Sequence, residues 1–505
     1  MELKVYKDNV SAAQLICETK LELPLETEFL IPDYLPQVFK VVKCMVIPVV
    51  LQKQISPGRL NVEGYLRCIV FYQAEGSGDL CQTEQKVPFS KQADCRQGEY
   101  DYACAPVEIG GEVEYVNCRA LSGRRMEVRG AFALSVRACA YRRSDVITAL
   151  DGEYVYPKSE TLQTAQMAGM AEKILTAEGD IAFEGEPEVI LHTQCSSTME
   201  EVKLLSGKAV VKGTVQAQVI YRAKGSEELL KTTADIPFHE ILDMEHADEQ
   251  CRAVAMLNAC GCTITGTEDD KTQLAVTAAL TVRAWKDIEL CVVQDAFSSQ
   301  QEMELETAQT PLEQVYEPLD EHVSASVSGQ LADAESEVLM ALATPLSVEL
   351  LENQEQCVLR GRVMAHVFCR NSAGEIDCYD KVCEYTVERE LTCRAAEICL
   401  LCQTDAVSVR AEKNGAELTA QLELNVTGFL SMVRATTTLA QVQLTEEPIH
   451  KENAPALYLY FAQENEAIYE IAKRYHVCPE ALCEINHCAQ GVLEEPKRLL
   501  VPRGM

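Results

Sequence analysis

The sequence predicts a mainly β protein, with three repeated β-sandwich or barrel-like domains, short connecting helices and a small βααβ domain at the C-terminal end. The main observation is one strand pattern that occurs three times, at Leu60–Tyr72, Ala209–Tyr221 and Cys357–Cys369. In each copy, small or apolar residues alternate with a more mixed set, which is typical of a strand with one buried face. A turn that contains glycine follows each copy and indicates a hairpin.

The spacing of these copies sets the expected domain organisation. Their central glycines, Gly64, Gly213 and Gly361, are 149 and 148 residues apart. The 505 residues exceed what a single core supports, because domains usually have about 100–200 residues. We therefore expect repeat domains at residues 1–150, 151–300 and 301–447, and a fourth domain at residues 455–505.

Each repeat is expected to contain two sets of strands. In the first copy, the strand Val38–Ile47 precedes the repeated strand, and the return strand ends near Pro88-Phe89. In the third copy Tyr385-Thr386 stands in place of the Pro-Phe pair, and we interpret this difference as drift. Further alternating strands close the units, at Glu127–Ala140, Gln273–Ala284 and Glu417–Phe429. Many short strands with glycine turns favour a sandwich or a barrel in each unit.

Helices are expected mainly at the joints. Val10–Cys17 is predicted to be a short helix, and Ser159–Ala177 an amphipathic connector helix between the first two units. The apolar residues at helical spacing in the connector are Met167, Met170, Ala171 and Ile174. The segment Phe297–Asp333 is rich in Glu, Gln, Ser and Ala, so we expect a flexible joint there.

The chain is strongly acidic. It has 45 Lys and Arg residues against 78 Asp and Glu residues, a formal net charge of −33. This charge repels the phosphate backbone of nucleic acids, so we expect no nucleic-acid partner. The acidity fits a solvated surface or, alternatively, a docking face for a basic protein.

The sequence predicts neither a signal peptide nor a transmembrane segment. Met1–Asp8 lacks the basic start and apolar core of a signal peptide, and no apolar run approaches the ~18 residues of a membrane span. We therefore expect a cytoplasmic protein. Its 23 cysteines have no repeated spacing, and in a reducing compartment such thiols act as small buried hydrophobic groups. A disulfide role in a mature assembly stays open.

Enzyme motifs are incomplete in this sequence. His239-Glu240 begins like a zinc-protease motif, but Asp243 stands where the second histidine is needed. Cys399 and Cys402 have zinc or redox spacing, yet no second close pair lies near them. No phosphate loop, dinucleotide fingerprint or nucleophile elbow occurs. We expect no catalytic residues, no metal site and no cofactor, and a cryptic hydrolase in one repeat is the disfavoured alternative.

The tail has a different pattern from the repeats. Leu457–Phe461 predicts a strand, Glu466–Tyr475 and Pro479–Asn486 predict helices, and Arg498–Pro502 predicts a closing strand. Pro479 suits a first helical turn, because its missing N–H would be unpaired there in any case. A strand-helix-helix-strand unit of this size is a small autonomous module.

This tail resembles a LysM domain. The resemblance rests on the aromatic first strand, Ile471–Val477, Pro479–Leu482, Ile485-Asn486 and Leu499–Pro502. The LysM family binds the N-acetylglucosamine chains of peptidoglycan or chitin along a groove between two loops. Here Glu464-Asn465-Glu466 replaces the usual Gly-Asp-Thr or Gly-Asp-Ser. Glycine lets a backbone approach a sugar closely, whereas a Glu side chain obstructs this approach.

The three upstream units resemble the SPOCS domain of clostridial spore-coat morphogenetic proteins. The residues that carry this resemblance are Val62–Gly64, Val211–Gly213 and Leu359–Gly361, together with the order of the domains. The resemblance implies a non-enzymatic structural adaptor of sporulation, located in the mother-cell cytoplasm at the forespore surface and in the spore coat. It also implies that the tail docks a coat-basement ATPase of the SpoIVA type and that the repeats act as a scaffold for other coat proteins. The alternative is a peptidoglycan-binding protein that its LysM-like tail targets to the cortex or cell wall.

The candidate residues for binding a partner or a glycan belong to the two tail loops that flank the expected groove. They are Glu464, Asn465, Ile468, Asn486, His487, Val492 and Leu493. An apolar centre within an acidic cluster suits a protein interface, where a few buried anchors dominate the affinity. A second interpretation places Ile468, Val492 and Leu493 in the core of the tail.

Overall fold

The computed structural model describes residues 3–268, 271–315, 318–352, 356–390, 397–449, 457–489 and 491–502. Within these residues the protein is mainly β, as the sequence predicts, and its two helices both lie in the tail. Tail residues 455, 456, 490 and 503–505 lie outside the described residues. No helix in the described part of the chain has the length and apolar character needed to cross a membrane.

The first unit is a sandwich of two three-stranded antiparallel sheets. One sheet has the order β1-β6-β5, formed by Lys4–Leu30, Arg125–Asp151 and Val107–Ser122. The other has the order β2-β3-β4, formed by Val38–Ser56, Arg59–Ala74 and Leu80–Asp94. The repeated strand is therefore the central strand β3. Apolar residues from both sheets, such as Val70 and Leu134, fill the core between them.

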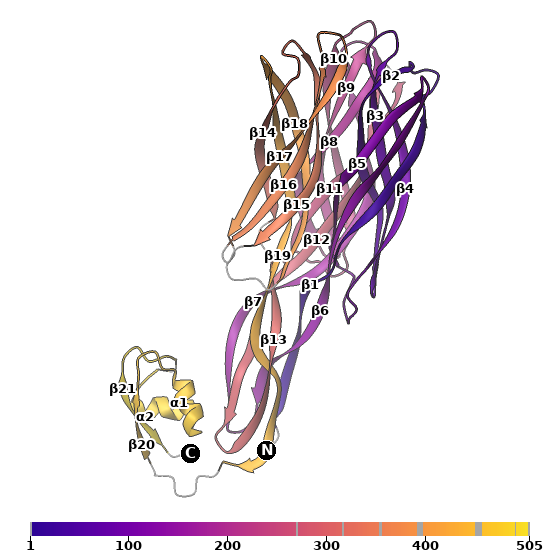
Figure 1. Cartoon of the computed structure of the whole chain (residues 1–505). Coiled ribbons are helices and arrows are strands. Elements are labelled where there is room, and N and C mark those ends of the chain that lie inside the picture. Colours follow the sequence, from indigo (N-terminus) through magenta and orange to yellow (C-terminus); the bar gives the residue numbers. More distant parts are fainter. Residues whose placement is uncertain are drawn as a thin grey trace.

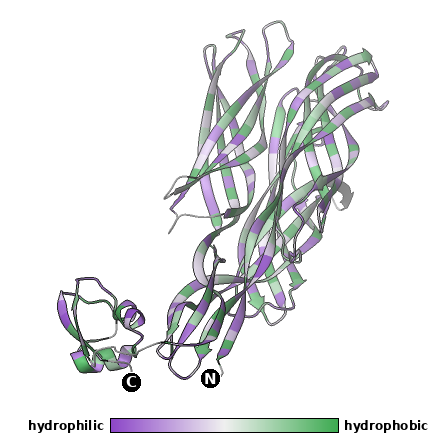
Figure 2. Ribbon diagram, turned by 60° about the horizontal axis from the view of Figure 1, so that its bottom comes forward, coloured by the Kyte–Doolittle hydropathy of each residue, from purple (hydrophilic) through white to green (hydrophobic). Residues whose placement is uncertain are grey.

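The second and third units repeat this arrangement. In the second, β7 (Val155–Ile181), β12 (Lys271–Ser298) and β11 (Arg252–Glu268) form one sheet, and β8 (Pro187–Leu205), β9 (Lys208–Ala223) and β10 (Leu229–Asp243) form the other. In the third, β15 (Glu337–Glu352), β16 (Gln356–Arg370) and β17 (Ile376–Glu390) form one sheet. The other joins β13 (Gln301–Val315), β14 (Leu319–Gln330) and β18 (Glu397–Asn414) to β19 (Glu417–Pro448). Hydrophobic and hydrophilic residues alternate along these strands (Figure 2).

The central glycine of each repeat faces an aromatic ring on the next strand. The three pairs are Gly64 with Phe89, Gly213 with Phe238, and Gly361 with Tyr385. A Cβ atom at Gly361 would lie 1.9 Å from the Tyr385 ring, so the ring fills the space that glycine leaves. Tyr385 keeps the aromatic position of the repeat, and the interpretation of this difference as drift is wrong.

The outer strands continue beyond the sandwiches as three two-stranded ribbons. Residues 4–15 pair with 139–151, residues 155–167 with 285–298, and residues 301–315 with 431–448. Apolar residues of all three ribbons, including Ile147, Val293 and Leu439, pack into one cluster. The ribbons form a narrow stalk below a head of three sandwiches (Figure 1).

The outer strand of each unit is irregular where the head meets the stalk. In β1 the register shifts between Leu15 and Cys17, and in β7 it shifts opposite Ala284 and Trp285. In the third unit the outer strand is divided into β13 and β14. A β-bulge bends a strand and increases its twist, so these irregularities turn each ribbon away from its sandwich.

Two predicted helices are strands in the structure. Val10–Cys17 lies in β1 and Ser159–Ala177 lies in β7. The register of β1 shifts after Leu15, so different faces of the strand are buried before and after this point. The buried apolar residues before and after the shift therefore recur at helical spacing. The connector helix is wrong because β7 pairs with β12 along its whole length, which overrides the helix propensity of its Ala, Met and Glu residues. The described part of Phe297–Asp333 belongs mostly to β13 and β14 rather than to a flexible joint.

The three sandwiches pack around a common axis through the outer faces of their repeated strands. Phe71, Ile220 and Phe368 each lie seven residues after the central glycine and belong to one apolar cluster. The ring centroids of Phe71 and Phe368 are 4.9 Å apart. The units therefore share an axial core in addition to the core within each sandwich.

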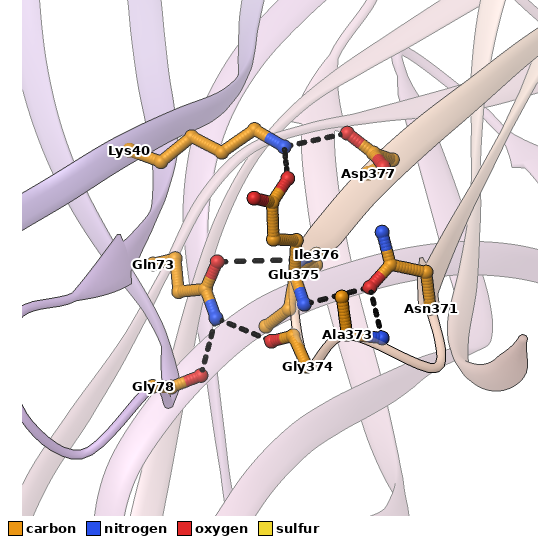
Figure 3. A network of polar contacts seen from close by, with 9 residues as sticks. All are labelled: Lys40, Gln73, Gly78, Asn371, Ala373, Gly374, Glu375, Ile376 and Asp377. Atoms are coloured by element: carbon orange, nitrogen blue, oxygen red, sulfur yellow. Dashed lines mark hydrogen bonds and ion pairs between the residues drawn. The ribbon is translucent and has the colours of Figure 1, made fainter.

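Polar contacts join the first unit to the third (Figure 3). The side-chain amide of Gln73 donates to the carbonyl oxygen of Gly374 at 2.7 Å and accepts from the backbone N–H of Ile376 at 3.2 Å. The ammonium group of Lys40 lies 2.8 Å from the Asp377 carboxylate. These contacts pair the polar groups at the edge of the axial core.

A buried polar network joins all three units at the base of the head. The carboxylate of Glu313, on β13, accepts hydrogen bonds from Ser431 at 2.6 Å and from the backbone N–H of Ala13 at 3.1 Å. Arg283 donates to the Tyr141 hydroxyl at 2.8 Å, and this hydroxyl donates to Glu313 at 3.4 Å. Burial raises the pKa of Glu313. The network therefore sets the relative positions of residues from three different repeats.

Candidate functional site

The tail is a two-stranded sheet with two short helices. Strand β20 (Leu457–Ala462) pairs with β21 (Lys497–Pro502), and α1 (Ile468–Tyr475) and α2 (Pro479–Asn486) lie between them in the chain. Ile471, Leu482 and Leu499 belong to their shared core. Each helix ends at a histidine in the left-handed conformation, a common way for a helix to end.

Two loops of the tail are joined by backbone hydrogen bonds. We call residues 463–467 loop 1 and residues 491–496 loop 2. The N–H of Asn465 donates to the carbonyl oxygen of Leu493 at 2.8 Å, and the N–H of Leu493 donates to Glu466 at 3.0 Å. Asn465 has φ of 64°, a conformation that Asn adopts more readily than most other residues with a side chain. The loops therefore form one continuous surface.

The predicted site residues divide into surface and core groups. Glu464, Asn465 and Val492 are exposed, and the Val492 side chain is 59% exposed although it is apolar. Ile468 and Leu493 are 1% and 7% exposed and belong to the tail core. The core interpretation therefore describes Ile468 and Leu493 but not Val492.

Asn486 and His487 lie at the end of α2. The Asn486 amide donates to the carbonyl oxygens of Leu482 and Leu500, both at 2.8 Å, and accepts from the N–H of Leu500 at 2.6 Å. It joins α2 to β21 through these bonds. His487 is the exposed C-cap of the same helix.

Acidic residues accompany the exposed Val492 in the two loops. Glu464 in loop 1 and Glu494 and Glu495 in loop 2 are exposed. Glu466 instead accepts a hydrogen bond from the Tyr460 hydroxyl at 2.5 Å, which ties loop 1 to β20. The joined loops thus combine an apolar side chain with acidic groups.

Helix α1 packs the tail against the stalk. The Tyr469 ring lies 5.4 Å from the Phe297 ring, centroid to centroid, and its hydroxyl donates to the carbonyl oxygen of Tyr156 at 3.3 Å. Lys473 pairs with Asp295 at 2.5 Å. The tail is therefore attached through a helix face that differs from the joined loops.

A cavity of about 740 Å³ lies inside the head. All three units contribute to its lining, with Arg67 and Glu108 from the first, His192 from the second, and His366 and Asp405 from the third. His192 is 8% exposed, and burial lowers its pKa to about 3. Burial also raises the pKa of Asp405 to about 6 and that of Glu108 to about 7. Burial therefore disfavours the charged forms of these three side chains.

Comparison with protein families gives a match to the SipL family, described as SipL, SPOCS domain, at residues 37–121 and 186–265. The first region covers β2 to β5, and the second covers β8 to β10 and most of β11. These two regions are therefore similar to SPOCS domains of the SipL type. The third unit has the same strand order in β15 to β18.

The match confirms the SPOCS resemblance of the repeated strand in the first two units and indicates a sporulation context. The SPOCS strands are inserted between the long strands that build the stalk, for example between β1 and β6. Neither the curated proteins nor the solved structures gave a significant match. The LysM resemblance of the tail stays a prediction.

Two functional features were not predicted from the sequence: the cavity in the head and the docking face of α1. The cavity residues Arg67, His192 and His366 come from different repeats and do not occupy equivalent positions, so no local pattern connects them. The docking face of α1 has a clearer signal. Tyr469 and Lys473 are four residues apart and therefore share one helix face.

Proposed function

We propose that this chain is a non-enzymatic structural adaptor in spore-coat assembly. In this proposal its head and stalk form a scaffold at the forespore surface, and its tail docks a coat-basement ATPase of the SpoIVA type. The observation that carries the proposal is the division of the tail surface. Helix α1 contacts the stalk through Tyr469 and Lys473, while the joined loops present Val492 and Asn465 to solvent.

The construction of the head supports a scaffold role. Three sandwiches share an axial core and the Glu313 network, so they behave as one body that keeps distant surfaces at fixed separations. Three residues after the central glycine, the repeats carry Arg67, Gln216 and Met364. A repeated fold with different surface chemistry suits the binding of several coat proteins better than one reaction repeated three times.

The chemistry of the joined loops supports a protein partner. Protein interfaces usually depend on a few apolar anchors, with charged groups that steer the partner and set specificity. Val492 is the exposed anchor here, and Glu464, Glu494 and Glu495 supply negative charge. The matching surface on the ATPase should offer an apolar pocket with basic residues beside it.

A pull-down with the ATPase tests this proposal. The full chain should retain the ATPase, whereas the chain without residues 455–505 and the Val492→Asp variant should lose it. Glu484→Ala, at an exposed position of α2, is the matched control and should bind normally. Retention of the ATPase by the truncated chain would move the docking site to the repeats.

Peptidoglycan binding is the second candidate. Gly491, with φ of 129°, keeps a side chain away from the start of loop 2, as close approach to a sugar requires. The full chain would then co-sediment with insoluble peptidoglycan, and the chain without residues 455–505 would not. If the full chain co-sediments with peptidoglycan and fails to retain the ATPase in the pull-down, the tail binds a glycan rather than the ATPase.

A further inference from the structure

Three metal-binding side chains converge on the third repeat, on the sheet face that meets the first unit. His366 on β16 lies directly opposite Asp380 on β17, and Cys378 precedes Asp380 by two residues, on the same face. Asp380 Oδ1 lies 2.7 Å from His366 Nδ1 and 3.4 Å from Cys378 Sγ. The ligand atoms of the three residues all lie within 4.8 Å of one another.

We propose that His366, Cys378 and Asp380 form a binding site for a divalent metal ion of the zinc type. Imidazole nitrogen, thiolate sulfur and carboxylate oxygen are the ligands that Zn²⁺ takes in proteins, at about 2.0–2.3 Å. A thiolate ligand also favours zinc over magnesium or calcium. The thiolate and the carboxylate supply two negative charges that face the dication. The short distances between the three side chains mean that only small side-chain movements are needed to surround an ion.

Neighbouring side chains orient two of the proposed ligands through hydrogen bonds and an ion pair. His366 Nε2 lies 3.2 Å from Thr344 Oγ1, which leaves Nδ1 directed toward Asp380. The second carboxylate oxygen of Asp380 pairs with the ammonium group of Lys43, from the first unit, so Oδ1 faces the other two ligands. Metal ligands in proteins are commonly oriented by such second hydrogen bonds.

The same positions in the other repeats carry different side chains. Strand pairing places Ile69, Gln82 and Glu84 there in the first unit. It places Gln218, Lys231 and Thr233 there in the second unit. Among the three equivalent places, the third repeat alone combines imidazole, thiol and carboxylate. The repeated fold explains the strands but does not explain this combination.

The three proposed ligands differ in their exposure to solvent. His366 is 5% exposed, whereas the Asp380 side chain is 34% exposed and Cys378 is half-buried. A metal ion can therefore enter from the side of Asp380 and Cys378. Bound there, it would stiffen the face of the third unit that Lys43 of the first unit contacts.

Cobalt and zinc titrations of the reduced, metal-free full chain test the proposal. Co²⁺ bound to a thiolate gives a charge-transfer band in the near ultraviolet, and Zn²⁺ should displace it at one equivalent. Cys378→Ser and His366→Gln should weaken Zn²⁺ binding more than about 100-fold, beyond the range that outer-shell changes produce. Thr344→Val, an outer-shell change, should weaken it about 10–100-fold. Cys291→Ser, at an exposed cysteine on β12, is the matched control and should leave binding unchanged.

The comparison of variants separates this site from the other thiols of the chain. A cobalt band of unchanged strength in Cys378→Ser would show that other cysteines bind the metal, and the proposal would be wrong. Asp380→Asn keeps the shape of the side chain, so it tests the site even if the other variants misfold. If Asp380→Asn is folded and binds Zn²⁺ with the affinity of the unmodified chain, the proposal is overturned as well.

Discussion

The ammonium group of Lys473 lies 2.6 and 2.5 Å from the two carboxylate oxygens of Asp295. Lys473 is on α1 of the tail and Asp295 is on β12 of the stalk. The side chains are 36% and 24% exposed, so the ion pair is only partly screened by water. Together with the Tyr469 contacts, it sets the orientation of the tail on the stalk.

Reversal of one charge in this pair should release the tail. In Lys473→Glu two carboxylates face each other, and we expect faster limited proteolysis around residue 455 and a larger radius of gyration in X-ray scattering. The double variant Lys473→Glu with Asp295→Lys should recover both values. Arg498→Glu, an exposed charge change on β21, is the control. Equal proteolysis of Lys473→Glu and the unmodified chain would contradict this account of docking.

Loss of the buried Glu313 carboxylate should destabilise the whole head. Glu313→Ala removes the carboxylate that accepts hydrogen bonds from Tyr141 and Ser431 and that interacts electrostatically with the buried Arg283. Removal of one member of a buried charged network costs about 3–5 kcal/mol. The free energy of unfolding from urea denaturation measures this effect. Glu304→Ala is an exposed substitution on the same strand and should change stability by less than about 0.5 kcal/mol. Equal free energies of unfolding for Glu313→Ala and Glu304→Ala would show that the network does not stabilise the head.

The glycine at the centre of each repeat should resist substitution. At Gly64 a Cβ atom would lie 2.1 Å from the backbone oxygen of Val49, so strands β2 and β3 would have to separate. We expect Gly64→Ala to lower the free energy of unfolding by about 1–3 kcal/mol. At Gly261 a Cβ atom would meet nothing within 4 Å, so Gly261→Ala should be neutral. A neutral Gly64→Ala would show that the strands are less tightly paired than described.

The contact between the second and third units should depend on pH. Asp405 accepts hydrogen bonds from Gln403 at 2.9 Å and from Ser197 at 3.3 Å, and burial raises its pKa from 3.8 to about 6. The folded chain therefore holds a proton that the unfolded chain has already released between about pH 4 and pH 6. Through this group, stability falls as pH rises across that window.

Replacement of the titrating group isolates its contribution. Asp405→Asn has no carboxyl group to ionise, so its stability should fall less steeply than that of the unmodified chain between about pH 4 and pH 6. Urea denaturation at several pH values measures both slopes. Parallel slopes would mean that Asp405 does not titrate in this window.

The sequence predicts the repeated strands and hairpins because side-chain alternation and glycine turns are local signals. It wrongly predicts helices at Val10–Cys17, which lies in β1, and at Ser159–Ala177, which lies in β7. Register shifts in both strands disturb the alternation, and pairing with strands that are distant in the sequence decides the structure. The axial cavity and the Glu313 network are equally hidden, since each combines residues from three repeats.

The candidate site was predictable in outline. The tail loops follow from the helix and strand boundaries, and Val492 and Glu464 are on the surface as a binding site requires. The burial of Leu493 and the bonding of Asn486 to β21 depend on packing between distant parts of the tail, which the chain order alone does not reveal. The pairing of His366 with Asp380 is likewise a consequence of strand register.

The most direct test of the adaptor proposal is the affinity of the full chain for the SpoIVA-type ATPase, measured with the Val492→Asp and Lys473→Glu variants. Val492→Asp puts a charge at the apolar anchor and should raise the dissociation constant by more than about tenfold. Lys473→Glu frees the tail from the stalk but leaves the joined loops intact, so its affinity should stay within about twofold. Unchanged affinity of Val492→Asp would contradict docking through the joined loops.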